Sequence, residues 1–271
     1  MTTEQSKLSQ ILAAAKAEDR AALIAYLPAG FPTVPGAVTA VQALIDGGVD
    51  AVEIGLPHSD PVLDGPTIQT ADDIALRGGI RTKDVLETVR QVTTANPDVP
   101  VLVMTYWNPV DRYGQTRFAA DLAAAGGAGC ILPDLPVEEA DEWLTAAQQH
   151  GLDTVFVVAP SSRDERLGKI TAKGSGFVYA AAVMGVTGTR AQVGNLAEDL
   201  VRRTRATTDL PVCVGLGVSN AEQAAEVAAF ADGVIVGSAF VQRLLDAESE
   251  EAGYAAVREL AAELAAGVRK R

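Results

Sequence analysis

Histidine, cysteine and lysine are scarce in this sequence of 271 residues, and their scarcity excludes several kinds of chemistry. Zinc sites need clustered histidines or cysteines, but His58 and His150 lie far apart and give no serine or cysteine nucleophile a clear partner. The two cysteines, Cys130 and Cys213, lie in separate apolar runs and are expected to be reduced core thiols. A Schiff-base enzyme needs a lysine on a strand. All six lysines fall in segments expected to be helical, loop or terminal, namely Lys7, Lys16, Lys83, Lys169, Lys173 and Lys270.

Long apolar runs and an excess of positive charge are also missing. No stretch approaches the roughly 20 apolar residues of a membrane span, and the first 20 residues lack the pattern of a signal peptide. The net charge of −13 disfavours nucleic acid or an anionic membrane surface as a partner. We therefore expect a cytoplasmic protein. A small anionic ligand is not excluded, because a few local amides can outweigh a distant field.

Short apolar runs rich in β-branched residues recur along the whole chain and are continuous rather than alternating. This pattern is typical of parallel strands that are covered on both faces. The runs occupy residues 22–27, 51–56, 99–105, 129–132, 153–159, 176–181, 211–215 and 233–236. Helical stretches separate them, for example over residues 36–46, 117–125, 138–149 and 221–229.

Eight strand–helix units predict an α/β protein with a single (β/α)8 TIM barrel, one domain over residues 1–271. A short amphipathic helix is expected before the first strand, and a helical tail is expected over residues 249–271. A doubly wound open sheet is the alternative. It is disfavoured because no linker interrupts the chain and no GxGxxG sequence follows the first strand.

Two carboxylates in one segment are the leading candidates for chemistry. Glu53 lies in an apolar run that otherwise indicates a buried strand, where a carboxylate is costly unless it is paired or used. Asp64 follows in a loop rich in proline and glycine. An apolar strand would raise the pKa of Glu53 and suit it to act as an acid, while Asp64 in a polar loop would stay ionised.

Glycines after the last two strands indicate a phosphate site. Residues 215–220 and 237–240 each lead from a strand into a helix, and glycine lets backbone N–H groups approach an anion at a helix N-terminus. Loops in these places commonly bind phosphate in barrels of this kind. A third glycine-bearing segment, residues 184–190, is expected to form a mobile lid over the same site, with a plain flexible loop as the alternative. Together these features favour proton transfer by carboxylates on a phosphorylated substrate.

Several motifs, in order and over nearly the entire chain, resemble those of the tryptophan synthase α chain family. They are YLPAGFP, VEIGLPHSDPVLDGPTIQ, MTYWNP, ILPDLPVEE, VYAAAVMGVTGTR, VGLGVS and IVGSAF. The resemblance implies a barrel lyase that cleaves indole-3-glycerol phosphate to indole and glyceraldehyde 3-phosphate by a retro-aldol reaction. It implies no cofactor in this chain, and a β chain that carries pyridoxal phosphate and receives indole in an α2β2 heterotetramer.

The resemblance also assigns residues. Glu53 would protonate the indole carbon that loses its side chain and then help to remove the glycerol hydroxyl proton, while Asp64 would bind the indole N–H. Substrate binding is implied for Tyr26, Tyr106, Leu132, Tyr179, Thr187, Gly188, Gly217, Gly237 and Ser238, with the last three and Gly188 around the phosphate. Contact with the β chain is implied for Asn108, Asp134 and Pro136.

Other interpretations of these residues stay open. Tyr26, Tyr106 and Leu132 could be ordinary packing at the barrel mouth, and Asp134 could cap a helix that starts near Pro136. A free-standing indole-glycerol-phosphate lyase, or a non-catalytic module that activates a β chain, are alternative functions. The segment also departs from the family. His58 stands where Phe or Tyr is usual, either as a packing variant or as a group that tunes the pH profile or the β-chain interface, and Val183 and Met184 differ from many relatives in the expected lid.

Overall fold

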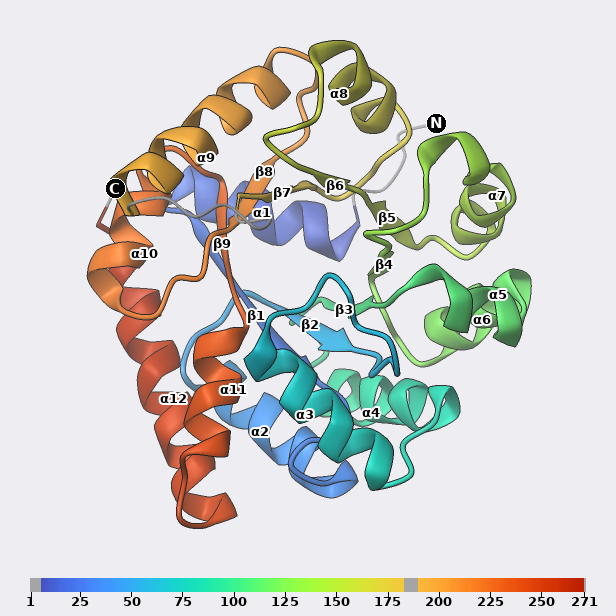
Figure 1. Ribbon diagram of the computed structural model, residues 1–271, viewed down its shortest axis with the longest axis vertical. Coiled ribbons are helices and arrows are strands. Elements are labelled where there is room, and N and C mark those ends of the chain that lie inside the picture. Colours follow the sequence, from blue (N-terminus) through green and yellow to red (C-terminus); the bar gives the residue numbers. More distant parts are fainter. Residues whose placement is uncertain (1–5, 183–189, 271) are drawn as a thin grey trace.

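Parallel strands form a barrel that helices surround in this computed structural model, which describes residues 6–182 and 190–270 (Figure 1). The strands are β1 (Ala22–Pro28), β2 (Ala51–Gly55), β3 (Val101–Met104), β4 (Gly129–Ile131), β5 (Asp153–Val155), β6 (Val157–Val158), β7 (Val178–Ala181), β8 (Val212–Gly215) and β9 (Gly233–Val236). Their order in the sheet is β5-β4-β3-β2-β1-β9-β8-β7-β6. Only Phe156 separates β5 from β6, so these two are one expected strand in two pieces. The predicted eight-unit barrel is confirmed.

One helix, α1 (Lys7–Ala17), precedes the first strand, and the others follow the strands around the outside of the barrel. These are α2 (Val34–Asp46), α3 (Pro66–Arg77), α4 (Thr82–Ala95), α5 (Trp107–Tyr113), α6 (Gln115–Ala124), α7 (Asp141–Gln149), α8 (Asp164–Thr171), α9 (Arg190–Arg205), α10 (Ala221–Ala228), α11 (Ser238–Leu245) and α12 (Glu250–Gly267), with a 3-10 turn η1 at Val137–Glu139. Several of these helices begin at a polar N-cap residue. At the start of α2, for example, the Thr33 side chain accepts a hydrogen bond from the backbone N–H of Gly36. Among the described residues, no helix is long and apolar enough to cross a membrane.

In the described part of the chain, three strands are each followed by two α-helices. Both α3 and α4 follow β2, both α5 and α6 follow β3, and both α11 and α12 follow β9. Gly114 separates α5 from α6 with φ +90°, a conformation that side chains with a Cβ rarely adopt. The first of these pairs matters for function, because the loop before α3 carries Asp64 at the carboxyl end of the barrel.

The barrel interior is filled by every second residue of the strands, since neighbouring side chains along a strand point to opposite faces. Inward-facing residues such as Ile24, Ala51 and Phe177 form one buried cluster with Leu8 and Leu12 of α1. Helix α1 therefore covers the amino end of the barrel. Two residues further along the same strands, at the carboxyl end, stand Tyr26, Glu53 and Tyr179.

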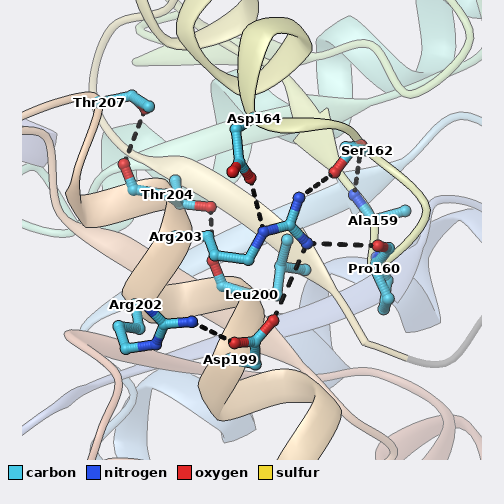
Figure 2. A network of polar contacts seen from close by, with 10 residues as sticks. All are labelled: Ala159, Pro160, Ser162, Asp164, Asp199, Leu200, Arg202, Arg203, Thr204 and Thr207. Atoms are coloured by element: carbon cyan, nitrogen blue, oxygen red, sulfur yellow. Dashed lines mark hydrogen bonds and ion pairs between the residues drawn. The ribbon is translucent and has the colours of Figure 1, made fainter.

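An arginine on α9 joins that helix to the loop between β6 and α8 (Figure 2). The Arg203 guanidinium donates to Asp164 Oδ1 at 2.7 Å and to the backbone oxygens of Ser162 and Pro160. Its other side faces Asp199 on the same helix at 3.9 Å. Arg203 thus holds a loop at the carboxyl end of the barrel against the helical layer.

Candidate active site

A cavity of about 420 Å³ opens at the carboxyl end of the barrel. Seven of the residues predicted from the sequence line it, namely Tyr26, Glu53, Asp64, Tyr179, Gly217, Gly237 and Ser238. They come from β1, β2, β7, the loops after β2 and β8, and the start of α11, so the barrel brings together residues that are more than 200 positions apart. Thr67, Ile68, Met104 and Ile235 complete much of the apolar wall.

Glu53 lies in the middle of β2, next to Tyr26 of β1 and Leu102 of β3 in the strand register. Its exposed fraction is 0%, and neither carboxyl oxygen has a hydrogen-bond partner among the residues that the structure describes. Burial raises the pKa of Glu53 from 4.5 to about 8. A carboxyl group that keeps its proton at neutral pH can act as a general acid.

Asp64 has different surroundings, in the loop that leads from β2 to α3. Its Oδ2 accepts a hydrogen bond from the Tyr106 hydroxyl at 2.8 Å, and that hydroxyl accepts from the backbone N–H of Leu63 at 2.9 Å. Burial raises the pKa of Asp64, while the hydrogen bond from Tyr106 and the charge of His58 act in the opposite direction. The anion of Asp64 thus has a hydrogen-bond donor that the anion of Glu53 lacks.

The two tyrosines in the cavity fit because glycines end the neighbouring strands. A Cβ on Gly55 would lie 2.2 Å from the Tyr26 hydroxyl oxygen, and a Cβ on Gly215 would lie 2.7 Å from that of Tyr179. Any residue larger than glycine at position 55 or 215 would displace the ring of the neighbouring tyrosine. The glycines therefore fix where the tyrosines project over the cavity.

The N-terminus of α11 is better placed to bind an anion than the N-terminus of α10. Helix α11 begins at Ser238 directly on the cavity, and the first N–H groups of a helix have no intrahelical partner. The start of α10 is already occupied, because Ala221 N–H donates to Glu263 and Ser219 N–H to Gln223. After β8, Gly217, with φ +65°, lines the cavity instead.

The remaining predicted residues that the structure describes lie outside this cavity. Tyr106 borders a smaller adjoining hollow with Asp64, whereas Leu132 is 1% exposed in the layer between strands and helices. Asp134 accepts from the backbone N–H of Trp107 at 2.8 Å, so it caps α5 and not a helix near Pro136. Leu132, Asp134 and Pro136 border one surface hollow, and Asn108 borders another with His58. The predictions for Val183, Met184, Thr187 and Gly188 fall outside the described residues.

Asp72 is a buried acid beside the site that the sequence did not single out. It is 3% exposed on the inner face of α3, and it shares a hollow of about 50 Å³ with Asp64 and Tyr26. Its Oδ1 has no hydrogen-bond partner within residues 6–182 and 190–270. Burial, and then the negative charge of Asp64, raise the pKa of Asp72 to about 7. The feature of the sequence that could have indicated its burial is its helical spacing from Ile68 and Ala75, which places Asp72 on the apolar face of α3.

Metal-binding and thiol chemistry find no support in the part of the chain that the structure describes. No group of three or more His, Cys, Asp or Glu side chains there could hold a metal ion. Cys130 and Cys213 are both free and buried, as expected from the sequence. The chemistry of the cavity therefore rests on its carboxyl and hydroxyl groups.

Comparison with known proteins agrees with this geometry. The family model described as tryptophan synthase alpha chain matches residues 12–269. The tryptophan synthase alpha chain of Streptomyces avermitilis is 74% identical over 97% of this chain and 94% of its own length. That of Thermobifida fusca is 57% identical over 97% of both chains. A structure of tryptophan synthase from Mycobacterium tuberculosis superimposes with a TM-score of 0.90 at 51% identity, covering 98% of this chain and 99% of that one. The resemblance predicted from the motifs is confirmed, and the chain belongs to the tryptophan synthase alpha chain family.

Proposed function

We propose that Glu53 carries out the proton transfers of this chain and that Asp64 stabilises the positive charge that develops on the substrate. As a tryptophan synthase α chain, it is a lyase that cleaves indole-3-glycerol phosphate to indole and glyceraldehyde 3-phosphate. It needs no cofactor for this step, and pyridoxal phosphate belongs to its partner, the β chain. The proposal concerns which residues of this chain carry the reaction.

The reaction begins with a proton transfer from Glu53 to the indole carbon that bears the glycerol phosphate side chain. The ring becomes a cation, and Asp64 accepts a hydrogen bond from the indole N–H and stabilises the positive charge. The Glu53 carboxylate then removes the proton of the neighbouring glycerol hydroxyl. Its O–H electrons form the new carbonyl, the C–C bond breaks, and the bonding electrons return to the ring. Glu53 is protonated again at the end of the cycle.

The observation that carries this proposal is the complete burial of the Glu53 carboxyl group without a hydrogen-bond partner in the described part of the chain. A charged group would be costly there, so the neutral acid is the resting form that the first step requires. The contrast with Asp64, which has a hydroxyl donor at 2.8 Å, supports the division of roles.

The same geometry supports assignments for binding. We assign the phosphate to Gly217, Gly237 and Ser238, with Gly188 of the segment outside the described residues, and the indole ring to Tyr26 and Tyr106. Tyr179, Thr187 and Leu132 complete the proposed substrate contacts. Leu132 would act through packing, because it lies behind the barrel wall.

We further propose a cytoplasmic, single-domain α chain in an α2β2 heterotetramer. The faces toward the β chain would include Asn108, Asp134 and Pro136. Support comes from their position, since the hollows that these residues border adjoin His58 and Leu132 around the mouth of the barrel.

The test is indole release by Glu53→Gln, assayed with the β chain present. Loss of a general acid should lower kcat by about 10²-fold or more, with little change in KM. Glu259→Gln is the matched control, because Glu259 is exposed on α12. Turnover by Glu53→Gln within a few fold of the control would refute the role of Glu53.

A further inference from the structure

The loop between β2 and α3, which carries Asp64, is tied to its neighbours on two sides. On the barrel side the link is Tyr106, which stands between β3 and α5, and on the helix side it is Gln69 in the first turn of α3. The reaction proposed above uses neither the hydroxyl of Tyr106 nor the amide of Gln69. Each of these groups is bonded to Asp64 and to a residue just before it.

The Tyr106 hydroxyl holds the backbone and a side chain of the loop at once. It accepts from the backbone N–H of Leu63 at 2.9 Å and donates to Asp64 Oδ2 at 2.8 Å. A hydroxyl has one proton to donate, so Tyr106 has none left for a substrate. The imidazole of His58 stacks on the same ring, with centroids 4.9 Å apart, and packs it in place. A second hydrogen bond to the carboxylate, from the indole N–H, would therefore go to Oδ1.

The Gln69 side chain holds the backbone of the same loop. Its amide Nε2 donates to the carbonyl oxygen of Asp64 at 2.8 Å and to that of Pro61 at 3.4 Å. The backbone N–H of Asp64 donates to the same Pro61 oxygen at 3.0 Å and closes a turn over residues 61–64. Gln69 thus links both ends of this turn to α3.

Both links lead to well-packed parts of the barrel, whereas the tip of the turn is exposed. Helix α3 packs on β1 and α11, and Ile68 of its first turn is buried and lines the cavity. Tyr106 is 9% exposed. In the turn itself, Val62 is 81% exposed and Leu63 is 44% exposed. Packing does not fix an exposed tip, so the two links determine where the Asp64 carboxylate stands.

We propose that Tyr106 and Gln69 are positioning residues that hold the Asp64 carboxylate where it meets the indole N–H. The inference rests on the role proposed above for Asp64 and adds two groups, a hydroxyl and an amide, that act on the reaction only through it. A group that stabilises a developing charge must already lie in place when the charge appears. A loop free to shift by about 1 Å would lose much of that stabilisation.

The chain offers a matched control for each residue. Tyr106→Phe removes the hydroxyl and keeps the ring, and Tyr254→Phe makes the same change on α12, where the hydroxyl bonds within its own helix. Gln69→Met removes the amide and keeps the length of the side chain. Gln91→Met is its control, because Gln91 is exposed on α4 and its amide donates to Glu87 at 2.8 Å.

We expect Tyr106→Phe and Gln69→Met to lose turnover and to keep their affinity for substrate. Indole release would be measured with the β chain present and expressed per folded molecule. A hydrogen bond to a charged carboxylate contributes more than one to a carbonyl, so kcat should fall about 10-fold in Tyr106→Phe and about threefold in Gln69→Met. KM should stay within about twofold of the wild type, because the ring of Tyr106 and the walls of the cavity remain. Both controls should match the wild type.

A second measurement asks whether the two residues act through Asp64. The Asp64→Asn variant lacks the charge that they are proposed to position, so adding Tyr106→Phe or Gln69→Met to it should have little further effect on kcat. Losses that multiply in the double variants would overturn the inference, as would a kcat of either single variant that matches its control. A rise in KM alone would also overturn it, because the residue would then be a substrate contact. Near-normal turnover by Asp64→Asn would instead refute the role of Asp64 itself.

Discussion

At the scale of single residues, burial of the Glu53 carboxyl group suits it to act as an acid but lowers the stability of the folded protein as the pH rises. Its pKa rises from 4.5 to about 8 on folding. Below about pH 4.5 the group is neutral in the folded and unfolded chains alike. Between pH 4.5 and pH 8 the unfolded chain releases the proton while the folded chain keeps it, so the free energy of unfolding falls with rising pH until about pH 8.

Glu53→Gln should therefore stabilise the protein in alkaline solution. The gain in free energy of unfolding over the wild type should grow by about 3 to 5 kcal/mol between pH 4.5 and pH 8.5, since each pKa unit corresponds to about 1.4 kcal/mol. Urea unfolding at several pH values measures this difference, with Glu259→Gln as the control. Parallel stability curves for Glu53→Gln and the wild type would show that Glu53 is not held neutral by the fold.

The difference between Glu53 and Asp72 shows what sequence can reveal about single residues. Glu53 was evident because a charged residue interrupts a continuous apolar run. Asp72 was less evident, because its helical spacing from Ile68 and Ala75 was the one signal in a helix with several polar positions, and the packing of α3 on β1 and α11 is what buries that side. Burial of a polar residue in a helix depends on tertiary contacts that lie far away in the sequence.

At the scale of elements, the positions of the strands and most helices followed from hydrophobic pattern and turn residues. The break at Phe156 did not, since residues 155–159 are all apolar and nothing in their sequence marks an interruption. The division of α5 from α6 at Gly114 also depends on a backbone conformation that composition alone does not determine. Boundaries of this kind depend on how the strands close into a barrel. A short stretch of sequence carries no information about that closure.

The link between α9 and the loop after β6 gives a prediction for neighbouring arginines. Arg203, with 21% of its side chain exposed, bonds to Asp164 and two backbone oxygens, whereas Arg202 is 73% exposed and pairs with Asp199 (Figure 2). Arg203→Met should lower the free energy of unfolding by about 1 to 3 kcal/mol, because it leaves carbonyl groups without a donor. Arg202→Met should cost less than about 0.5 kcal/mol. Chemical denaturation of the two variants measures both values, and equal losses would contradict the account.

At the scale of the whole molecule, the two ends of the barrel serve different purposes. The amino end is filled by Leu8, Leu12 and Ala15 of α1, which pack against the inward-facing strand residues. The carboxyl end holds Glu53 and the cavity. A substitution at one end should therefore leave the property of the other end intact, as is general for barrels with this arrangement.

Leu8→Ala tests this separation at the amino end. Leu8 is fully buried, so truncation should lower the free energy of unfolding by about 2 to 5 kcal/mol through lost burial and a new cavity. Leu196→Ala, at a leucine that is 40% exposed on α9, should cost far less and serves as the control. Indole release per folded molecule should be unchanged in Leu8→Ala, because Ile24, Ala51 and Phe177 lie between Leu8 and the residues that line the cavity. A fall in kcat for the folded fraction would mean that α1 also supports the position of Glu53, and that the two ends of the barrel are coupled.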